Sequence, residues 1–186
     1  MKKVLFCAAL SALVMLTAQN SFADTSNSAT AHVYMNVVAN IAVQPGTPNV
    51  DAGSVQMGDF DATFDFRIDA NTEGVAMNLA ASPLFKGDDP RGTAVAPIPL
   101  NLSAGVDVSC DNANPMRGID GNASYVGDTT IGAFPARQAE DLQFESSQNG
   151  HFSQTCRTTV TWTQDDPEKP MGEYSGKVKL AAMVMP

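Results

Sequence analysis

Residues 32–43 read HVYMNVVANIAV, and apolar side chains occupy every second position of this stretch. The apolar positions are Val33, Met35, Val37, Ala39, Ile41 and Val43. A two-residue period is that of a β-strand with one buried face, because successive side chains of a strand point to opposite sides. The stretch is therefore predicted to form a strand, which can pair within its own domain or with another molecule.

The first 23 residues have the layout of a secretory signal peptide. Lys2 and Lys3 form a basic start, residues 4–17 form an apolar run, and Ser21 and Ala23 are small residues of the kind that a signal peptidase reads. The run is too short for a stable membrane span. We expect cleavage after Ala23 and export of a soluble chain, with residues 24–30 as a disordered polar lead.

The chain is acidic, with a formal net charge of −9 that becomes −11 if the two positive charges of Lys2 and Lys3 are removed. A negative surface of this size argues against nucleic acid and anionic membranes as partners and favours solubility. The remaining length suits one domain of sandwich size that is large enough to bury a core.

Cys110 and Cys156 remain once the leader is removed. An exported protein with two cysteines most simply forms one disulfide. The bridge would close a loop of about 45 residues, for which the chain-entropy model gives about 4 kcal/mol. Two free buried thiols are the alternative, whereas a metal site is disfavoured because two cysteines and a distant histidine do not make a tetrahedral ligand set.

Further alternating stretches recur at the spacing of an all-β sandwich. Residues 60–68 alternate, residues 70–74 resemble a turn, and the next strand begins at Val75, so this pair is predicted to be a hairpin. Later strands are predicted around residues 156–162 and 178–184, whereas residues 111–135 are rich in turn signals. No window has helical periodicity, and one all-β domain is predicted.

Candidate catalytic residues are few. His32 and His151 are the two histidines, and the chain contains neither a GxSxG nor an HExxH motif. Four carboxylates share one strand parity, which favours a solvated sheet face over paired acid and base groups; they are Asp59, Asp61, Asp65 and Asp69. We therefore expect no enzymatic activity, no cofactor and no metal site.

Residues 172–176 read Gly-Glu-Tyr-Ser-Gly, and the alternating strand that follows them to Pro186 resembles the end of a Gram-negative pilin. Together with the leader, the apolar stripe and the acidic all-β body, the chain resembles subunits of chaperone–usher pili. Within that class it is most similar to the alternative branch that includes the colonisation-factor (CFA/I, CS1-type) major pilins. Residues 31–43 resemble that family's N-terminal extension running into its first core strand, whereas the Cys110 and Cys156 pair is a departure from those pilins.

The resemblance implies an immunoglobulin-like β-sandwich that is incomplete because it lacks its last strand. A periplasmic chaperone lends a strand, and the N-terminal extension of the next subunit then replaces it by donor-strand exchange at an outer-membrane usher. The contact is head-to-tail, so it builds a fibre. The implied partners are identical or related pilin subunits, the chaperone, the usher and a host receptor, and the implied location is an extracellular adhesive fimbria on a Gram-negative bacterium.

Carried onto this sequence, residues 24–38 are the donor extension and residues 39–186 are the pilin β-sandwich domain. The donated side chains are Ala31, Val33, Met35 and Val37, and the groove that receives them is bordered by Val178, Leu180, Ala182 and Val184. One alternative stays open: a self-contained secreted β-sandwich adhesin or binding module, recognising glycan or protein, would use residues 31–43 within its own fold.

Overall fold

The longest strands are β2 (Gly58–Ala70) and β11 (Phe152–Gln164), which pair along their whole lengths in antiparallel register. The computed structural model describes residues 32–185. On β2 and β11, buried side chains alternate with more exposed ones, so each strand has one face in the core. Ile68 and Val160 are completely buried on this face, and Trp162 is 2% exposed.

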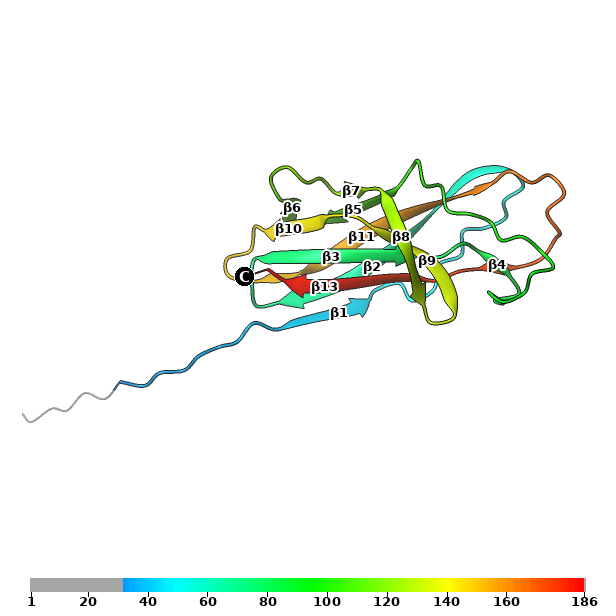
Figure 1. The fold of residues 1–186 in the computed structure, drawn as a ribbon. Coiled ribbons are helices and arrows are strands. Elements are labelled where there is room, and N and C mark those ends of the chain that lie inside the picture. Colours follow the sequence, from blue (N-terminus) through cyan, green and yellow to red (C-terminus); the bar gives the residue numbers. More distant parts are fainter. Residues whose placement is uncertain (1–31, 186) are drawn as a thin grey trace, which may run out of the picture. The chain divides into compact units, whose positions relative to one another are not determined.

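β2 and β11 form the centre of one layer of strands (Figure 1). β1 (Ile41–Pro45) pairs with the other edge of β2, and β5 (Val106–Cys110) pairs with the other edge of β11. Two short strands, β6 (Ala113–Pro115) and β7 (Asn122–Ala123), each pair with β5.

β3 (Gly74–Ala81) is the centre of the second layer. β13 (Val178–Val184) pairs with one edge of β3, and β10 (Leu142–Ser146) and β9 (Phe134–Ala139) share the other edge. β8 (Tyr125–Ile131) pairs with β9, so the β8–β9 hairpin is the end of this layer.

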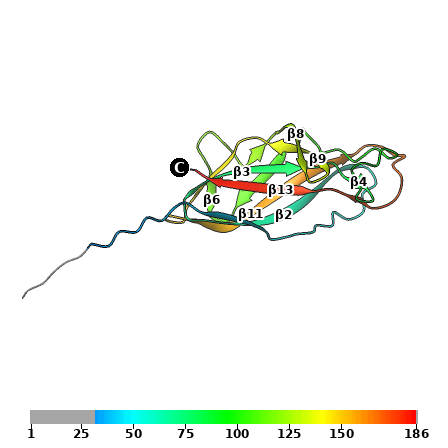
Figure 2. The same cartoon turned by 60° about the horizontal axis from the view of Figure 1, so that its bottom comes forward.

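By hydrogen bonding these strands form one 11-stranded antiparallel sheet, because β6 joins β5 to β10. The sheet curls strongly (Figure 2), and the inward side chains of both layers form one core cluster. β4 (Phe85–Lys86) and β12 (Tyr174–Ser175) make a separate two-stranded sheet. No helix occurs in residues 32–185, so the prediction of an all-β fold is confirmed, and the curled sheet is consistent with a β-sandwich.

The predicted hairpin between residues 60–68 and the strand from Val75 is wrong. β2 pairs with β1 and β11, whereas β3 pairs with β13, β10 and β9. Residues 71–73 therefore carry the chain from one layer to the other. Both edges of β2 are occupied, and alternation along a strand does not show which strand lies beside it.

Other strand predictions have mixed outcomes. The last strand occupies Val178–Val184 as predicted, and the strand around residues 156–162 is longer, at Phe152–Gln164. Residues 32–40 are not in a strand, and β1 begins at Ile41, two residues later than Ala39. Residues 111–135, which are rich in turn signals, contain β6, β7 and β8 and the start of β9.

The predicted disulfide is confirmed: the two sulfurs of Cys110 and Cys156 are 2.07 Å apart. The cysteines lie directly opposite each other on β5 and β11, with their Cα atoms 4.1 Å apart. The neighbouring pair is hydrogen-bonded, since the Asp111 N–H donates to the Thr155 carbonyl. The cysteines therefore occupy a non-hydrogen-bonded position, where facing Cα atoms of an antiparallel ladder are closest.

Ser82 joins the end of β3 to the start of β13. Its N–H donates to the Lys177 carbonyl over 2.9 Å, and its hydroxyl accepts the Lys177 N–H over 2.8 Å. Its carbonyl accepts the indole N–H of Trp162 over 3.0 Å. Gly176 passes so close that an added Cβ would lie 2.7 Å from the Leu84 Cδ2 and 2.9 Å from the Pro83 carbonyl oxygen. A glycine is needed here for space.

Candidate functional site

β1 and β13 lie side by side without pairing (Figure 1). Cα atoms of the two strands come within 8 Å of each other. β1 is hydrogen-bonded to β2 and β13 to β3, and in the described part of the chain neither has a strand partner on its other edge. We call the two facing edges and the side chains beneath them the β1–β13 edge.

The backbone of β13 presents a row of free groups to this edge. The Ser82 N–H donates to the Lys177 carbonyl and the Met185 N–H to the Gly74 carbonyl, which identifies the hydrogen-bonded pairs at the two ends of the ladder. Because such pairs alternate, odd-numbered residues of β13 bond to β3. The N–H and C=O groups of the even-numbered residues therefore point away from β3; these residues are Val178, Leu180, Ala182 and Val184.

β1 also presents free backbone groups to this edge. The Asn71 N–H donates to the Asn40 carbonyl over 3.2 Å, and the Gly46 N–H donates to the Asp65 carbonyl over 2.7 Å. Even-numbered residues of β1 therefore bond to β2, and the backbone groups of Ile41 and Val43 point away from it. The β1–β13 edge thus has a row of unpaired strand groups on each side, the usual template for pairing with a further strand.

The core is incompletely covered along this edge. Ile41 and Val43 of β1 pack against the core but stay half-buried, as do Val178, Ala182 and Val184 of β13. Leu180 is 7% exposed, whereas its partner Leu79 on β3 is completely buried. The four residues predicted to border the groove therefore lie together on one strand edge and face the core.

The predicted donor residues belong to a separate unit, since the chain divides into Met1–Val37 and Val38–Pro186. Val33, Met35 and Val37 are 92%, 85% and 68% exposed. Residues 32–37 form no strand, so their alternating apolar side chains have no sheet to cover. Ala31, the predicted signal peptide at residues 1–23 and the predicted polar lead at residues 24–30 lie outside the described residues.

The four carboxylates of β2 face outward, away from the core, and bind side chains of β11. Thr163 and Thr161 each donate a hydroxyl hydrogen bond of 2.6 Å, to Asp59 and Asp61. Arg157 forms an ion pair of 2.9 Å with Asp65. The Arg67 guanidinium and the Ser153 hydroxyl both donate to Asp69, and these hydrogen bonds lower the pKa of its carboxyl group. These groups form a polar outer face, as predicted, and not an acid–base pair.

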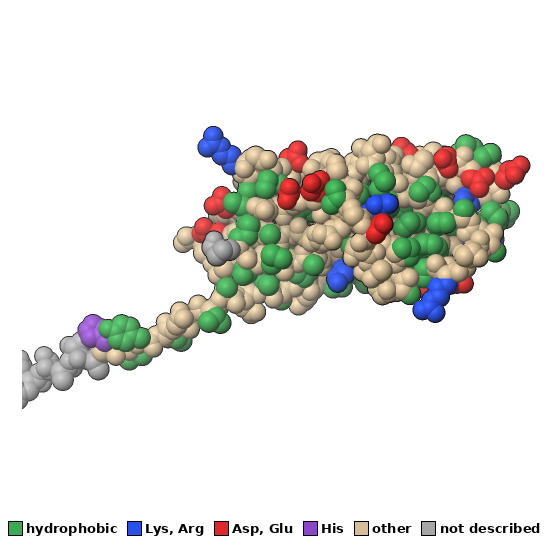
Figure 3. All heavy atoms as spheres, viewed as in Figure 1, with side chains coloured by type: hydrophobic (Ala, Val, Ile, Leu, Met, Phe, Trp, Pro, Cys, Tyr) green, Lys and Arg blue, Asp and Glu red, His purple; other side chains and the backbone are tan. Residues whose placement is uncertain are grey.

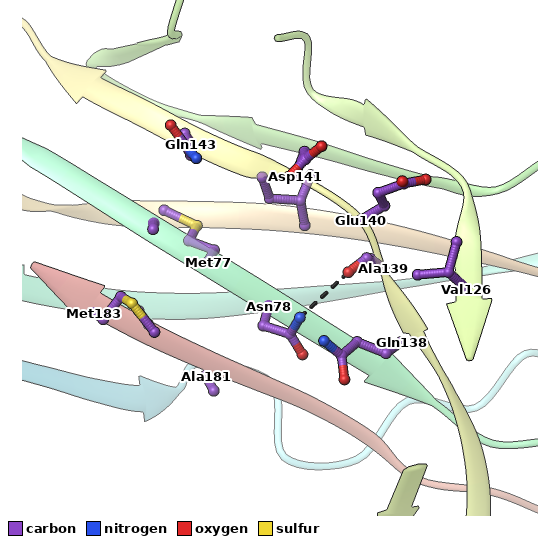
Figure 4. A pocket seen from close by; sticks show the side chains of 13 residues that line it. Met77, Asn78, Val126, Gln138, Ala139, Glu140, Asp141, Gln143, Ala181 and Met183 are labelled. Atoms are coloured by element: carbon purple, nitrogen blue, oxygen red, sulfur yellow. Dashed lines mark hydrogen bonds between the residues drawn. The ribbon is translucent and has the colours of Figure 1, made fainter. Parts of the chain in front are cut away.

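A cavity of about 370 Å³ opens on the outer face of β3 and β13, beside β9 (Figure 4). Asn78 donates a hydrogen bond of 3.3 Å from its amide to the Ala139 carbonyl within it. Side-chain amides and carboxylates surround the opening, joined by the exposed Met183. The polar lining residues are Asn78, Gln138, Glu140, Asp141 and Gln143. The strand pattern gave no signal for this cavity, because it depends on the β8–β9 hairpin that the sequence left unassigned.

His151 is exposed, and its Nδ1 lies 3.1 Å from the Asn149 carbonyl oxygen. Within residues 32–185, no group of three or more His, Cys, Asp or Glu side chains is arranged to hold a metal ion. The same residues include no helix long and apolar enough to cross a membrane. On the face seen in Figure 3, charged side chains are scattered among hydrophobic and neutral ones, with no gathering of Lys and Arg.

Comparison of the chain with models of protein families finds no match, and no curated protein matches it. The features that bear on function are the β1–β13 edge and the exposed apolar side chains of Val33, Met35 and Val37.

Proposed function

We propose that the chain is a structural subunit of an exported fibre of the chaperone–usher pilus class. In this proposal residues 32–37 of one copy insert as a strand at the β1–β13 edge of the next. The observation that carries it is the pairing of two features on one chain: an apolar strand edge with free backbone groups on both sides, and an exposed segment with apolar side chains at strand spacing.

Addition of a strand at this edge would satisfy the free backbone groups and cover the half-buried core side chains at the same time. A donated strand supplies N–H and C=O groups to the free rows of β1 and β13, and its alternate side chains cover the half-buried core. Val33, Met35 and Val37 provide three apolar side chains at the required two-residue spacing. Full burial of a side chain of this size contributes about 1.5–3 kcal/mol.

Insertion requires β1 to move. A strand placed between two others needs them about 9.6 Å apart, twice the usual spacing of about 4.8 Å, whereas Cα atoms of β1 and β13 come within 8 Å. β1 is short and, among the described residues, pairs with β2 alone, through the five residues Ile41–Pro45. β1 is therefore the strand that can move away from β13 to admit a further strand.

The remaining parts of the proposal follow from the resemblance. The fold would be an immunoglobulin-like sandwich without its last strand, protected by a periplasmic chaperone and assembled at an outer-membrane usher. Residues 1–23 would direct export and then be removed. Each copy would give its strand to the next in a head-to-tail contact that does not close on itself, so the product is a fibre on the cell surface.

The test exploits strand parity. In the full mature chain, the double variant Val33→Asp/Met35→Asp places charges on the face that would be buried. The matched control Tyr34→Asp/Asn36→Asp adds the same charge to the opposite face of the same segment. We expect the first variant to stay monomeric in size-exclusion chromatography and electron microscopy while the control still forms polymers.

Equal assembly of the two variants would refute donation of this stripe. A wild-type chain that is monomeric at high concentration, and that binds a glycan or protein saturably, would instead favour the self-contained binding module. The cavity beside Asn78 and Met183 is the feature that such a module would use, and Asn78→Ala would then reduce binding.

A further inference from the structure

Asn71, the first residue after β2, holds the chain just ahead of β1. Its Oδ1 accepts the Asn40 N–H over 2.6 Å, and its Nδ2 donates to the Val38 carbonyl over 2.8 Å. Its own N–H donates to the Asn40 carbonyl over 3.2 Å. One side-chain amide therefore binds two backbone groups on residues 38–40, which themselves are outside any strand.

The β1–β2 ladder cannot continue past this point by itself. Its register pairs Ile41 with Ala70, so three further steps would place Glu73 opposite Val38. Glu73 is bound elsewhere, because its carbonyl accepts the Ser146 N–H over 2.9 Å and its carboxylate accepts the Gly150 N–H over 2.6 Å. The amide of Asn71 thus takes the place of the missing strand partner for residues 38–40.

We infer that Asn71 is the positioning residue that fixes the boundary between the exchangeable segment and the residues that the subunit keeps in its own fold. The inference rests on the proposed strand exchange and names its boundary: Val38 is held by its own domain, and Val37 is the last residue available for donation. The division of the chain into two units falls between the same two residues.

The boundary has a consequence for the fibre. With Val37 in the neighbouring copy and Val38 bound to Asn71, no residue is left over as a spacer between subunits. The donated side chains are then Val33, Met35 and Val37, and the side chain of Val38, although apolar and 73% exposed, is not one of them.

An asparagine is suited to this role because its amide carries an acceptor and a donor on one planar group. Asn71→Asp keeps an oxygen for the Asn40 N–H but places a carboxylate oxygen against the Val38 carbonyl. Asn71→Ala removes both contacts. The two variants therefore separate the two hydrogen bonds, and Asn49, an exposed asparagine without a side-chain hydrogen bond in residues 32–185, offers the matched controls Asn49→Asp and Asn49→Ala.

The first measurement is hydrogen–deuterium exchange of the full mature chain in its monomeric form. Loss of the Asn71 contacts in Asn71→Ala should speed exchange of the Asn40 amide about tenfold, because the net stabilisation of about one hydrogen bond is removed. Asn71→Asp should retain protection at Asn40, and both Asn49 controls should match the wild type. Exchange in β11 should stay unchanged in every variant. An Asn40 amide that exchanges equally in Asn71→Ala and Asn49→Ala would overturn the inference and leave strand exchange untouched.

The second measurement locates the boundary itself. Peptides of residues 32–37 and 32–40 are titrated onto the full chain carrying Val33→Asp/Met35→Asp, which cannot donate its own strand. Equal affinity of the two peptides supports a boundary at Val37. An affinity at least tenfold higher for the longer peptide would overturn the boundary alone. Failure of both peptides to bind would overturn the proposed function and the boundary with it.

Discussion

Substitution of Gly176 by alanine should destabilise the protein strongly, because the backbone here passes close to its neighbours. The new Cβ would lie 2.7 Å from the Leu84 Cδ2, 2.9 Å from the Pro83 carbonyl oxygen and 2.9 Å from the Ser82 hydroxyl. All three contacts are with the segment that joins β3 to β4. One of them is with the backbone carbonyl of Pro83, so relief requires movement of the backbone and not only of a flexible side-chain end. Movement would also disturb the hydrogen bonds between Ser82 and Lys177.

The expected loss has two parts. Overpacking of a tight site costs about 1–3 kcal/mol, and each hydrogen bond that is weakened adds up to about 1 kcal/mol. We therefore expect the free energy of unfolding to fall by about 2–4 kcal/mol for Gly176→Ala. In a domain of this size each kcal/mol lowers the melting temperature by roughly 2–4 °C, so the midpoint should fall by roughly 5–15 °C.

Thermal unfolding followed by circular dichroism, with the disulfide intact, measures this loss. Gly92→Ala is the matched control, because the nearest atom to its new Cβ is the flexible carboxylate oxygen of Asp89 at 3.1 Å. A surface change of that kind should alter stability by no more than about 0.5 kcal/mol. Equal melting temperatures for the two variants would refute the argument that close approach, and not turn conformation, demands glycine before β13.

Two further predictions concern the core. Replacing Cys110 and Cys156 together by alanine opens a loop of sequence separation 46. The free energy of unfolding, obtained from urea denaturation, should fall by about 4 kcal/mol. A fall of less than about 1 kcal/mol would contradict the entropic account. Burial raises the pKa of Tyr125, whose hydroxyl has no hydrogen-bond partner among the described residues. Folding therefore favours the neutral phenol, and the free energy of unfolding should fall as the pH rises above 10.0, the ordinary pKa of a tyrosine. Tyr125→Phe should reduce that alkaline loss in pH-dependent unfolding and be neutral or slightly stabilising at pH 7, whereas a strongly destabilised variant would mean that the hydroxyl is bound.

The strands that the sequence predicted correctly are those in which one face is buried over many residues. Burial alternates along β13 from Val178 to Val184 and along β11 from Phe152 to Gln164. The alternating stretches at residues 178–184 and 156–162 of the sequence therefore identify the two strands. The disulfide was predictable for a similar reason, because Cys156 lies on the buried face of β11 and the sequence has one other cysteine outside the predicted leader. An alternating sequence pattern is enough to predict a strand where burial of one face is what stabilises that strand.

Strand neighbours were less predictable, because alternation specifies a face and not a partner. β2 and β3 follow each other with a three-residue connection, yet they belong to different layers. Residues 32–37 show the opposite case: their apolar side chains alternate as in a strand, but no strand of the described residues pairs with them and they form none. The β8–β9 hairpin was missed because Gly127 and Gly132, both at positive φ, interrupt its pattern with turn signals.

The sequence predicts which side chains border the candidate site, but not which backbone groups are free there. The apolar parity of β13 was plain in the sequence, whereas the free edge depends on which residues bond to β3, and that register follows from the Ser82–Lys177 and Gly74–Met185 pairs. Asn71 had a weak signal, as an asparagine placed directly between a strand and a turn, a position where its side chain often replaces a backbone partner. Its target, Val38, could not be foreseen from spacing.

The β1–β13 edge also restricts what can occupy it. On both strands the residues that face the core, such as Ile41 and Leu180, are those whose N–H and C=O groups point to the open edge. A helix would cover the side chains but has no free backbone groups to offer, since its own are bonded internally. An apolar ligand would bury the N–H and C=O rows without partners, at a cost of about 1–3 kcal/mol for each group. An extended chain with apolar residues at every second position would meet both requirements, and the apolar residues of the segment 32–37 have this spacing.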